Sequence, residues 1–130
     1  NKIDKWIEIR SQLTYFDLVS NYKSAKALII PVRNSLQDQA RFPFKISEYT
    51  ASKRPIITSN SGAIKEFFID GDNAFVAKAD DIDSFVDKFN KVIEQPDLAD
   101  EIGLNGYKLG KKVFNYKSYS NELLSFLSNS

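Results

Sequence analysis

The sequence has 130 residues, of which 42% are hydrophobic and 27% charged, and a formal net charge of +1. This composition is typical of one globular domain with its own core, and the small net charge favours neither nucleic acid nor a membrane surface as a partner. No apolar run approaches the ~20 residues that cross a bilayer. Cysteine and histidine are absent, which excludes disulfides, thiolate or imidazole metal sites and Ser-His-Asp or Cys-His catalytic centres from this sequence.

Strand patterns and helix patterns alternate in the first third of the sequence. Residues 6–10 alternate apolar and polar side chains and predict a strand. A helix capped by Thr14 follows, with apolar residues at helical spacing. The continuous apolar run at residues 27–31 predicts a strand buried on both faces, as in a parallel sheet. Polar residues 32–42 predict an irregular loop.

The alternation continues and then gives way to helices. Residues 43–52 predict a helix, residues 55–58 and 74–78 predict two further buried strands, and a short helix lies between those strands. After residue 80 the pattern predicts a helix capped by Asp80 or Asp81, a second helix that opens at Pro96 and is weakened by glycines, and a terminal amphipathic helix at residues 118–130. The sequence therefore predicts one α/β domain with a parallel sheet and a helical C-terminal segment.

The helix at residues 43–52 has an unusual pattern. On a helical wheel, two apolar sides are separated by a polar strip: Phe44 with Ala51, Ile46 with Tyr49, and between them Lys45, Glu48 and Ser52. A helix with one solvated face has a single apolar stripe, so this pattern predicts packing on both sides and a polar strip at an opening.

Two interpretations of that polar strip remain open. The first is a surface ion pair between Lys45 and Glu48, which stand three residues apart. The second is a ligand site, because open α/β sheets bind ligands beyond the carboxyl ends of their strands, where helices begin. There Lys45 would supply charge to a phosphate and Glu48 would accept hydrogen bonds from sugar hydroxyls.

Five motifs occur in order: SAKALIIP, PFKISEYTASKRP, TSNSGAIKEF, DGDNAF and PDLADEIGLNG. Together they resemble the C-terminal domain of group 1 (family four) glycosyltransferases of the GT-B fold. The resemblance implies a Rossmann-like parallel sheet flanked by helices, which binds a UDP- or GDP-sugar donor. It also implies retaining transfer of hexosyl type without a cofactor or metal ion, in the synthesis of surface polysaccharide or lipid-linked glycan.

The resemblance implies a donor site residue by residue. Glu48 matches a helix glutamate that contacts the ribose hydroxyls, and Lys45 matches a lysine of one variant of that motif. The remaining positions match the loop that touches the diphosphate and sugar, which is Gln39, Ala40, Arg41 and Phe42, and the segment that receives the base, which is Ser11, Gln12 and Leu13. No residue of this chain is assigned as catalytic.

Two departures from the family pattern concern the loop. Ala40 stands where many members carry a second glutamate that contacts the transferred sugar, and the usual loop glycines are missing. Asp38 is the nearby candidate to replace the carboxylate, and Arg41 is the candidate to supply charge for the diphosphate. These departures keep an alternative open, namely a degenerate, non-catalytic α/β module that binds a nucleotide or a protein.

The resemblance further implies that residues 1–130 form a single, partial donor-binding domain. Family members have a strand, a turn and a helix before the position of Trp6, and an acceptor-binding domain before those. We therefore expect the acceptor, a glycan or lipid-linked sugar, to bind elsewhere, and no sugar transfer by these residues alone. We expect a cytoplasmic protein. The basic residues Lys108, Lys111, Lys112 and Lys117 indicate a solvated face, with peripheral contact to the inner face of a membrane as the alternative.

Overall fold

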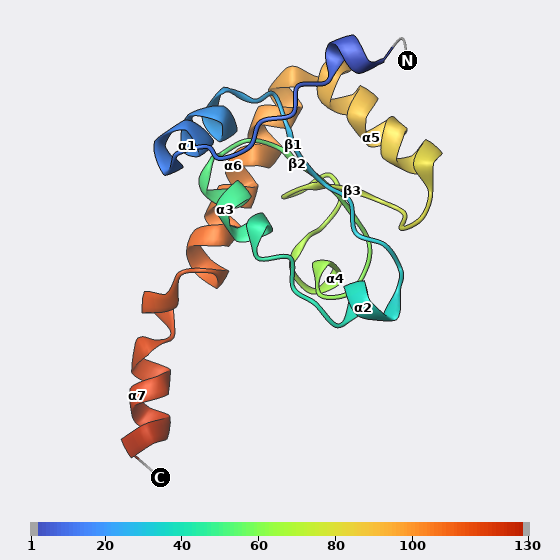
Figure 1. Cartoon of the computed structure of the whole chain (residues 1–130). Helices are drawn as coiled ribbons and strands as arrows, with labels where there is room; N and C mark the ends of the chain where they lie inside the picture. The colour runs from blue at the N-terminus through green and yellow to red at the C-terminus, as the bar shows by residue number, and fades with distance from the viewer. Residues whose placement is uncertain (1–2, 129–130) are drawn as a thin grey trace.

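Three short parallel strands lie at the centre of the fold in the computed structural model, which describes residues 3–128 (Figure 1). The strands are β1 (Leu28–Ile30), β2 (Ile56–Ser59) and β3 (Phe75–Ala77), and they stand side by side in that order. In the register, Ile57 pairs with Ile29 on one side and with Phe75 on the other. The three continuous apolar runs thus form the predicted parallel sheet.

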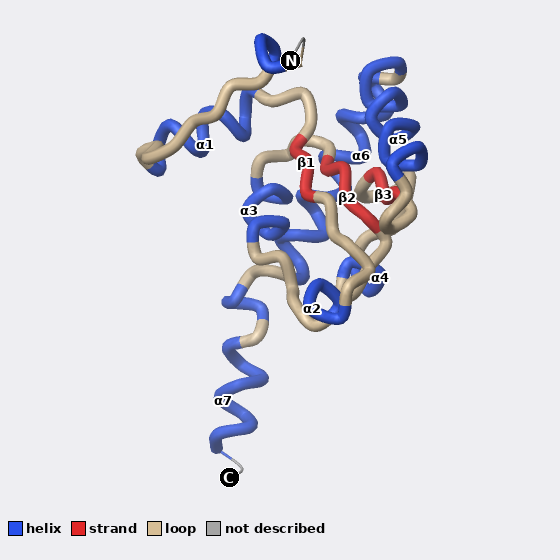
Figure 2. Tube along the Cα trace, turned by 45° about the vertical axis from the view of Figure 1, so that its right-hand side comes forward, coloured by secondary structure: helices blue, strands red, loops and turns tan. Residues whose placement is uncertain are grey.

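Helices connect and flank these strands (Figure 2). Two predicted caps are confirmed: the Thr14 side chain accepts a hydrogen bond from the backbone N–H of Asp17, and the Asp81 side chain accepts one from Ser84. The α-helices are α1 (Tyr15–Ser24), α2 (Leu36–Gln39), α3 (Lys45–Ala51), α4 (Ile64–Phe67), α5 (Ile82–Glu94), α6 (Pro96–Val113) and α7 (Ser120–Ser128), and two 3₁₀ turns are Asp4–Trp6 and Tyr116–Ser118.

Strand β2 is buried along its whole length and separates two hydrophobic clusters. Ile56 belongs to one cluster and Ile57 to the other, because successive side chains of a strand point to opposite faces. The first cluster contains Val32, Ile46, Ile56, Ile64, Phe68 and Ala74, and the second contains Ile57, Phe75, Val92, Ala99 and Ile102.

Helix α6 is continuous over 18 residues, although its glycines predicted a weakened helix. The glycines let it pack closely on the rest of the fold. A Cβ added to Gly103 would lie 2.6 Å from the carbonyl oxygen of Lys53, and one added to Gly110 would meet the side chain of Thr50. The helical propensity lost at these positions is offset by close packing of Gly103 against the α3–β2 turn and of Gly110 against α3.

The strand predicted at residues 6–10 is wrong. A 3₁₀ turn ends at Trp6, and residues 7–11 have no regular secondary structure. Trp6 is 79% exposed and Ile9 is 90% exposed. Alternation of side chains yields a strand only where a neighbouring strand completes the backbone hydrogen bonds, and no described strand lies beside this segment.

Strand β1 is an edge strand in the described part of the chain. The expectation that it is buried on both faces is wrong, because Ile29 is 42% exposed whereas its neighbour Leu28 is buried. The polar loop at residues 32–42 also differs from the expectation, because Ser35 caps the short helix α2 within it.

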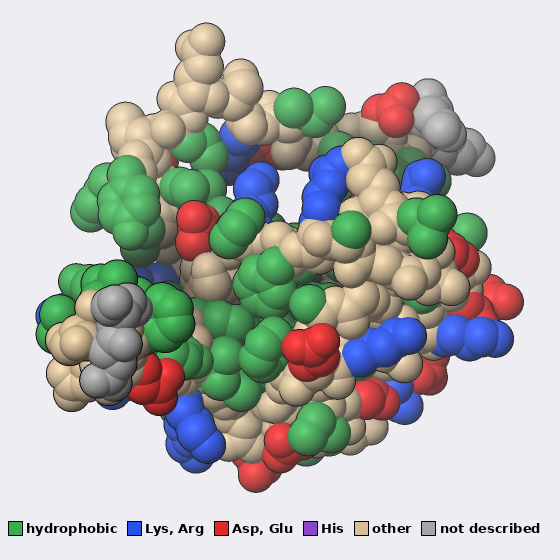
Figure 3. All heavy atoms as spheres, turned by 90° about the horizontal axis from the view of Figure 1, so that it is seen from below, with side chains coloured by type: hydrophobic (Ala, Val, Ile, Leu, Met, Phe, Trp, Pro, Cys, Tyr) green, Lys and Arg blue, Asp and Glu red, His purple; other side chains and the backbone are tan. Residues whose placement is uncertain are grey.

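The terminal helix α7 projects from the body (Figure 1). It carries exposed Leu123, Leu124 and Leu127, and hydrophobic side chains also gather on the face seen from below (Figure 3). The predicted helix extended to residue 130, but residues 129–130 lie outside the described part. Within residues 3–128, no helix has the length and apolar character that a membrane span requires.

Candidate functional site

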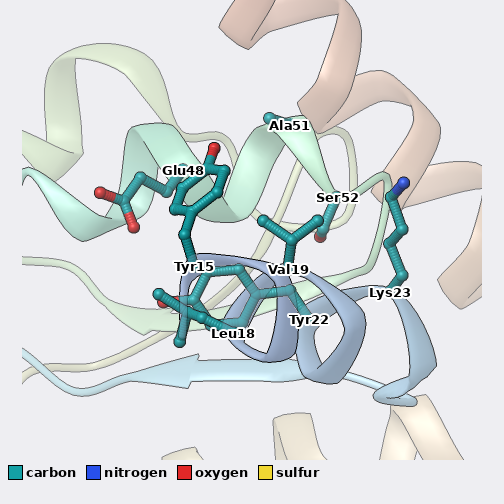
Figure 4. A pocket seen from close by; sticks show the side chains of 8 residues that line it. All are labelled: Tyr15, Leu18, Val19, Tyr22, Lys23, Glu48, Ala51 and Ser52. Carbon is teal, nitrogen blue, oxygen red and sulfur yellow. The ribbon is translucent and has the colours of Figure 1, made fainter. Parts of the chain in front are cut away.

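A hollow lies between α1 and α3, and its volume is about 250 Å³ (Figure 4). Helix α1 presents mainly aromatic and aliphatic side chains to it, and α3 presents small and acidic ones. The residues that line this α1–α3 hollow are Tyr15, Leu18, Val19, Tyr22, Lys23, Glu48, Ala51 and Ser52. Two walls that come from separate helices, one of them aromatic, suit a flat ring with polar edges.

Glu48 stands at one end of the α1–α3 hollow with its carboxylate turned outward, and Lys23 stands at the other end (Figure 4). Glu48 is exposed. Among the described residues, its carboxylate accepts no hydrogen bond and joins no ion pair. In particular, the surface pair between Lys45 and Glu48, one of the two interpretations of the polar strip, does not form. A carboxylate in this state can accept hydrogen bonds from a ligand.

Tyr22 and Tyr49 join the two helices beneath this hollow. Their rings meet edge to face with centroids 5.1 Å apart. Burial raises the pKa of the Tyr49 phenol, and the negative charge of Glu48 raises it further. Burial also raises the pKa of Tyr22, with smaller contributions from Tyr49 and Glu48. Both phenols therefore stay neutral and can donate hydrogen bonds at neutral pH.

A second, larger hollow of about 580 Å³ lies beside the segment that leads into α3. The end of β1 forms its floor, and the segment after α2 forms its wall. Its lining residues are Ile30, Pro31, Val32, Asp38, Ala40, Arg41, Phe42, Pro43 and Phe44. This loop hollow thus collects Ala40, Arg41 and Phe42 of the predicted donor loop, together with Asp38, the candidate for the missing carboxylate.

The loop is anchored through Phe42, whose ring packs against those of Phe67 and Phe114 at centroid distances of 6.0 Å and 5.4 Å. Phe42 is therefore half-buried, whereas Arg41 beside it is exposed. The aromatic contact fixes the backbone of the loop to α4 and to the end of α6. It leaves the charged side chain of Arg41 directed to solvent at the hollow.

Sequence reasoning missed three residues that hold the segment after β1. The hydroxyl of Ser59 accepts a hydrogen bond from the backbone N–H of Val32 at 3.2 Å, and the hydroxyl of Ser61 donates one to the carbonyl of Arg33 at 2.8 Å. Gly62 has φ +52°, and a Cβ there would lie 3.0 Å from the Cα and carbonyl oxygen of Gln39. The TSNSG motif thus holds the segments that border the loop hollow. The sequence of the motif alone does not predict this role.

The remaining predicted site residues lie apart from the two hollows. Ser11, Gln12 and Leu13 are exposed just before α1, and Gln12 has φ +55°. Lys45 is exposed at the start of α3. In the part of the chain that the structure describes, these four residues stand outside the lining of both hollows. The side chain of Gln39 points back to Asn34 and hydrogen-bonds it.

The prediction that α3 packs on both apolar sides is half correct. Ile46 is fully buried and Tyr49 is half-buried, as expected. Phe44, however, is 81% exposed, and Ala51 is exposed at the α1–α3 hollow. The second apolar side thus borders the two hollows, where Phe44 meets the ring of Phe42 edge to face at 6.2 Å but stays exposed.

Comparison with known proteins identifies the family of this chain. The family model described as glycosyl transferases group 1 matches residues 3–109. An uncharacterized glycosyltransferase of Methanocaldococcus jannaschii is 24% identical over 106 residues, which cover 82% of this chain and 29% of that protein. The chain therefore spans less than a third of the length of this relative.

Two solved structures share the fold. Sucrose-phosphate synthase from Thermosynechococcus elongatus superimposes with a TM-score of 0.80 at 16% identity, over 98% of this chain and 32% of that one. Anabaena HepE in complex with UDP-glucose superimposes with a TM-score of 0.74 at 15% identity, over 85% and 29%. The parallel sheet, its flanking helices and the matched family model agree. This chain belongs to the glycosyl transferases group 1.

Proposed function

We propose that this chain is the donor-binding part of a retaining glycosyltransferase and that it binds a UDP- or GDP-sugar along α3. The observation that carries the proposal is the position of Glu48, whose carboxylate has no hydrogen-bond or ion-pair partner among residues 3–128 and lies at the end of the α1–α3 hollow, one turn from the loop hollow. Phe44 and Glu48 are four residues apart, which is about 6 Å along a helix axis. One nucleoside diphosphate sugar can span that separation.

The two hollows suit different parts of such a ligand. The aromatic and aliphatic wall of the α1–α3 hollow suits a base, and Glu48 at its rim suits the two ribose hydroxyls. Arg41 at the loop hollow and Lys45 nearby supply positive charge for the diphosphate. The sugar then occupies the loop hollow near Asp38, which stands within two residues of the position where many family members carry a glutamate.

Binding of UDP-glucose by HepE, a structure of the same fold, supports a nucleotide-sugar as the ligand class. Under this proposal the donor sugar is the group transferred, and no metal ion or cofactor takes part. The acceptor is a glycan or a lipid-linked sugar of a surface polysaccharide pathway, and the reaction takes place in the cytoplasm or at the inner face of a membrane. This chain covers 32% of the sucrose-phosphate synthase chain and 29% of the HepE chain, and under this proposal transfer needs both donor and acceptor parts.

A second candidate function rests on Ala40. This residue lines the loop hollow where many members of the family have a carboxylate, and a chain without that group can retain nucleotide binding without transfer. The two candidates differ in sugar recognition: in a transferase the sugar of the bound nucleotide-sugar contacts residues of the loop hollow, whereas in a nucleotide-binding module those residues respond alike to the nucleotide and its sugar conjugate.

Calorimetric titration with UDP and GDP tests the proposal. We expect Glu48→Ala to weaken binding by roughly 1–3 kcal/mol, because the ribose hydroxyls lose a charged acceptor. Glu48→Gln keeps an acceptor of the same shape and should lose less. Glu66→Ala is the matched control, since Glu66 is an exposed glutamate on α4 outside both hollows. Equal affinities of wild type and Glu48→Ala would contradict the proposal.

A further inference from the structure

We propose that Asp80 is a positioning residue that holds the donor loop in its binding conformation; this inference rests on the proposed donor site. Asp80 lies just before α5, outside the lining of the loop hollow. Its backbone has φ +57°, in the left-handed region, and its carboxylate oxygen Oδ2 accepts a hydrogen bond from the backbone N–H of Asn34 at 3.1 Å. Asp80 thus reaches across 46 residues of sequence to the segment that follows β1.

Asn34 is in turn hydrogen-bonded to Gln39, the first residue of the predicted donor loop. The amide nitrogen Nε2 of Gln39 donates to the carbonyl oxygen of Asn34 at 3.1 Å and to its side-chain Oδ1 at 3.0 Å. Gln39 is the last residue of α2, and Ala40 and Arg41 of the loop hollow follow it directly. A chain of hydrogen bonds therefore runs from the start of α5 to the residues that would contact the diphosphate and sugar.

Three successive residues after β1 are each held by one hydrogen bond, called a tie here, and Asp80 provides the third. Val32 is held by Ser59, Arg33 by Ser61, and Asn34 by Asp80. The first two ties come from the end of β2, and Ser59 and Ser61 are buried. The tie from Asp80 is exposed and is the last of the three before α2. It therefore restrains Asn34, to which the side chain of Gln39 is hydrogen-bonded at the end of α2.

The backbone conformation of Asp80 distinguishes this role from a role in helix capping. A left-handed conformation is unfavourable for a residue with a Cβ, although Asp and Asn tolerate it better than most. Glycine would adopt it without strain but would have no side chain to reach Asn34. The cap of α5 is Asp81, which also pairs with Lys78 at 3.7 Å. Aspartate at position 80 thus gives the loop a hydrogen bond at Asn34, although its own backbone conformation is unfavourable.

A loop that is ordered before the ligand arrives binds more tightly than one that becomes ordered on binding, because less conformational entropy is lost. Removing the Asp80 side chain should therefore weaken donor binding without weakening the fold. This separation of affinity from stability is the signature of a positioning residue. A purely structural residue would lower both together.

The test uses the full chain with UDP as the probe and three variants. Asp80→Gly removes the hydrogen bond to Asn34 and relieves the backbone strain. Asp80→Asn keeps a hydrogen-bond acceptor and tolerates the left-handed backbone conformation. Lys53→Gly is the control, because Lys53 also has positive φ but lies in the α3–β2 turn away from the loop. The measurements are hydrogen exchange of the Asn34 amide by NMR, the dissociation constant for UDP, and the midpoint of thermal unfolding.

For Asp80→Gly we expect a midpoint equal to or above that of wild type, exchange of the Asn34 amide about fivefold faster, and a UDP dissociation constant about fivefold higher. Asp80→Asn should stay within about twofold of wild type in both of the last two measurements. Lys53→Gly relieves the same backbone strain but loses the contact of the Lys53 ammonium with the Tyr107 ring, and it should leave exchange at Asn34 and UDP binding unchanged.

An Asp80→Gly variant with wild-type exchange at Asn34 and wild-type UDP affinity would overturn the inference. A fall in midpoint that accompanies the loss of affinity would also overturn it, in favour of a purely structural role. A wild-type chain that binds no UDP contradicts the proposed function; the restraint by Asp80 is then supported by faster Asn34 exchange in Asp80→Gly and refuted by unchanged exchange.

Discussion

The ring of Tyr22 meets the ring of Tyr49 edge to face, with centroids 5.1 Å apart and planes at 76°. This contact joins α1 to α3. It lies beside the residues that form the α1–α3 hollow, where Tyr22 itself is part of the wall. The ring contact thus helps to set the geometry of the proposed base site, together with the hydrogen bond that Arg54 Nε donates to the carbonyl oxygen of Lys23 at 2.7 Å.

We predict a favourable coupling energy between these two tyrosines. Tyr22→Leu and Tyr49→Leu should each lower the free energy of unfolding, and the double variant should lose less than the sum of the single losses by about 0.5–1.5 kcal/mol. Urea unfolding of the four proteins measures this cycle. Additive losses would show that the ring contact does not itself stabilise the docking of α1.

The raised pKa values of Tyr22 and Tyr49 predict loss of this docking at high pH. A phenol whose pKa is raised in the folded state contributes stability that is present below the ordinary tyrosine pKa of about 10, and this stability is lost as pH rises through the raised value. We expect Glu48→Gln to shift the pKa of Tyr49 back toward its ordinary value, because a neighbouring negative charge is removed. NMR titration of the tyrosine ring carbons measures the shift. An unchanged Tyr49 pKa in this variant would contradict the proximity of the Glu48 charge.

Gly103→Ala should destabilise the fold strongly for a change of one methyl group. The added Cβ would lie 2.6 Å from the carbonyl oxygen of Lys53 and 2.8 Å from the backbone nitrogen of Pro55, so α6 or the α3–β2 turn must move. We expect a loss of about 1–3 kcal/mol, typical of overpacking. Thermal unfolding measures it, with Leu104→Ala, at an exposed position of the same helix, as the control. A more stable Gly103→Ala variant would refute the close approach.

Gly62→Ala should weaken UDP binding together with stability. Its φ of +52° is unfavourable for alanine, and the new Cβ would press on the backbone of Gln39 at 3.0 Å. We expect a loss of about 1 kcal/mol in the free energy of unfolding from the backbone alone, and displaced amide signals for residues 38–42. The comparison of NMR spectra of the two proteins checks this. Loop signals that coincide with those of wild type would show that α2 does not rest on Gly62.

The sheet could be predicted from the sequence because its strands are continuous apolar runs, and burial on both faces needs such runs. β2 illustrates this, since all four of its residues are buried. Residues 6–10 show the limit of the same reasoning. Their alternation satisfies the local condition for a strand, but a strand also requires a partner, which a local pattern does not specify.

The candidate site was predicted in part for a similar reason. Glu48 was identified through its position on a helical wheel, which is local information. The ties to the loop from Ser61 and Asp80 connect residues 28 and 46 positions apart, and no periodicity reports such pairs. Phe44 was expected to be packed because it is apolar. Its exposure follows from the hollow beside it, which forms only when the segment after α2 folds against β1.

The most direct test of the donor site is an NMR titration of the chain with UDP, GDP and their sugar conjugates. We predict saturable shifts at Glu48, at the α1 residues of the α1–α3 hollow and at residues 38–42, with a preference for one base and loss of the shifts in Glu48→Ala. The absence of saturable shifts at millimolar ligand, or shifts confined to residues outside both hollows, would contradict it.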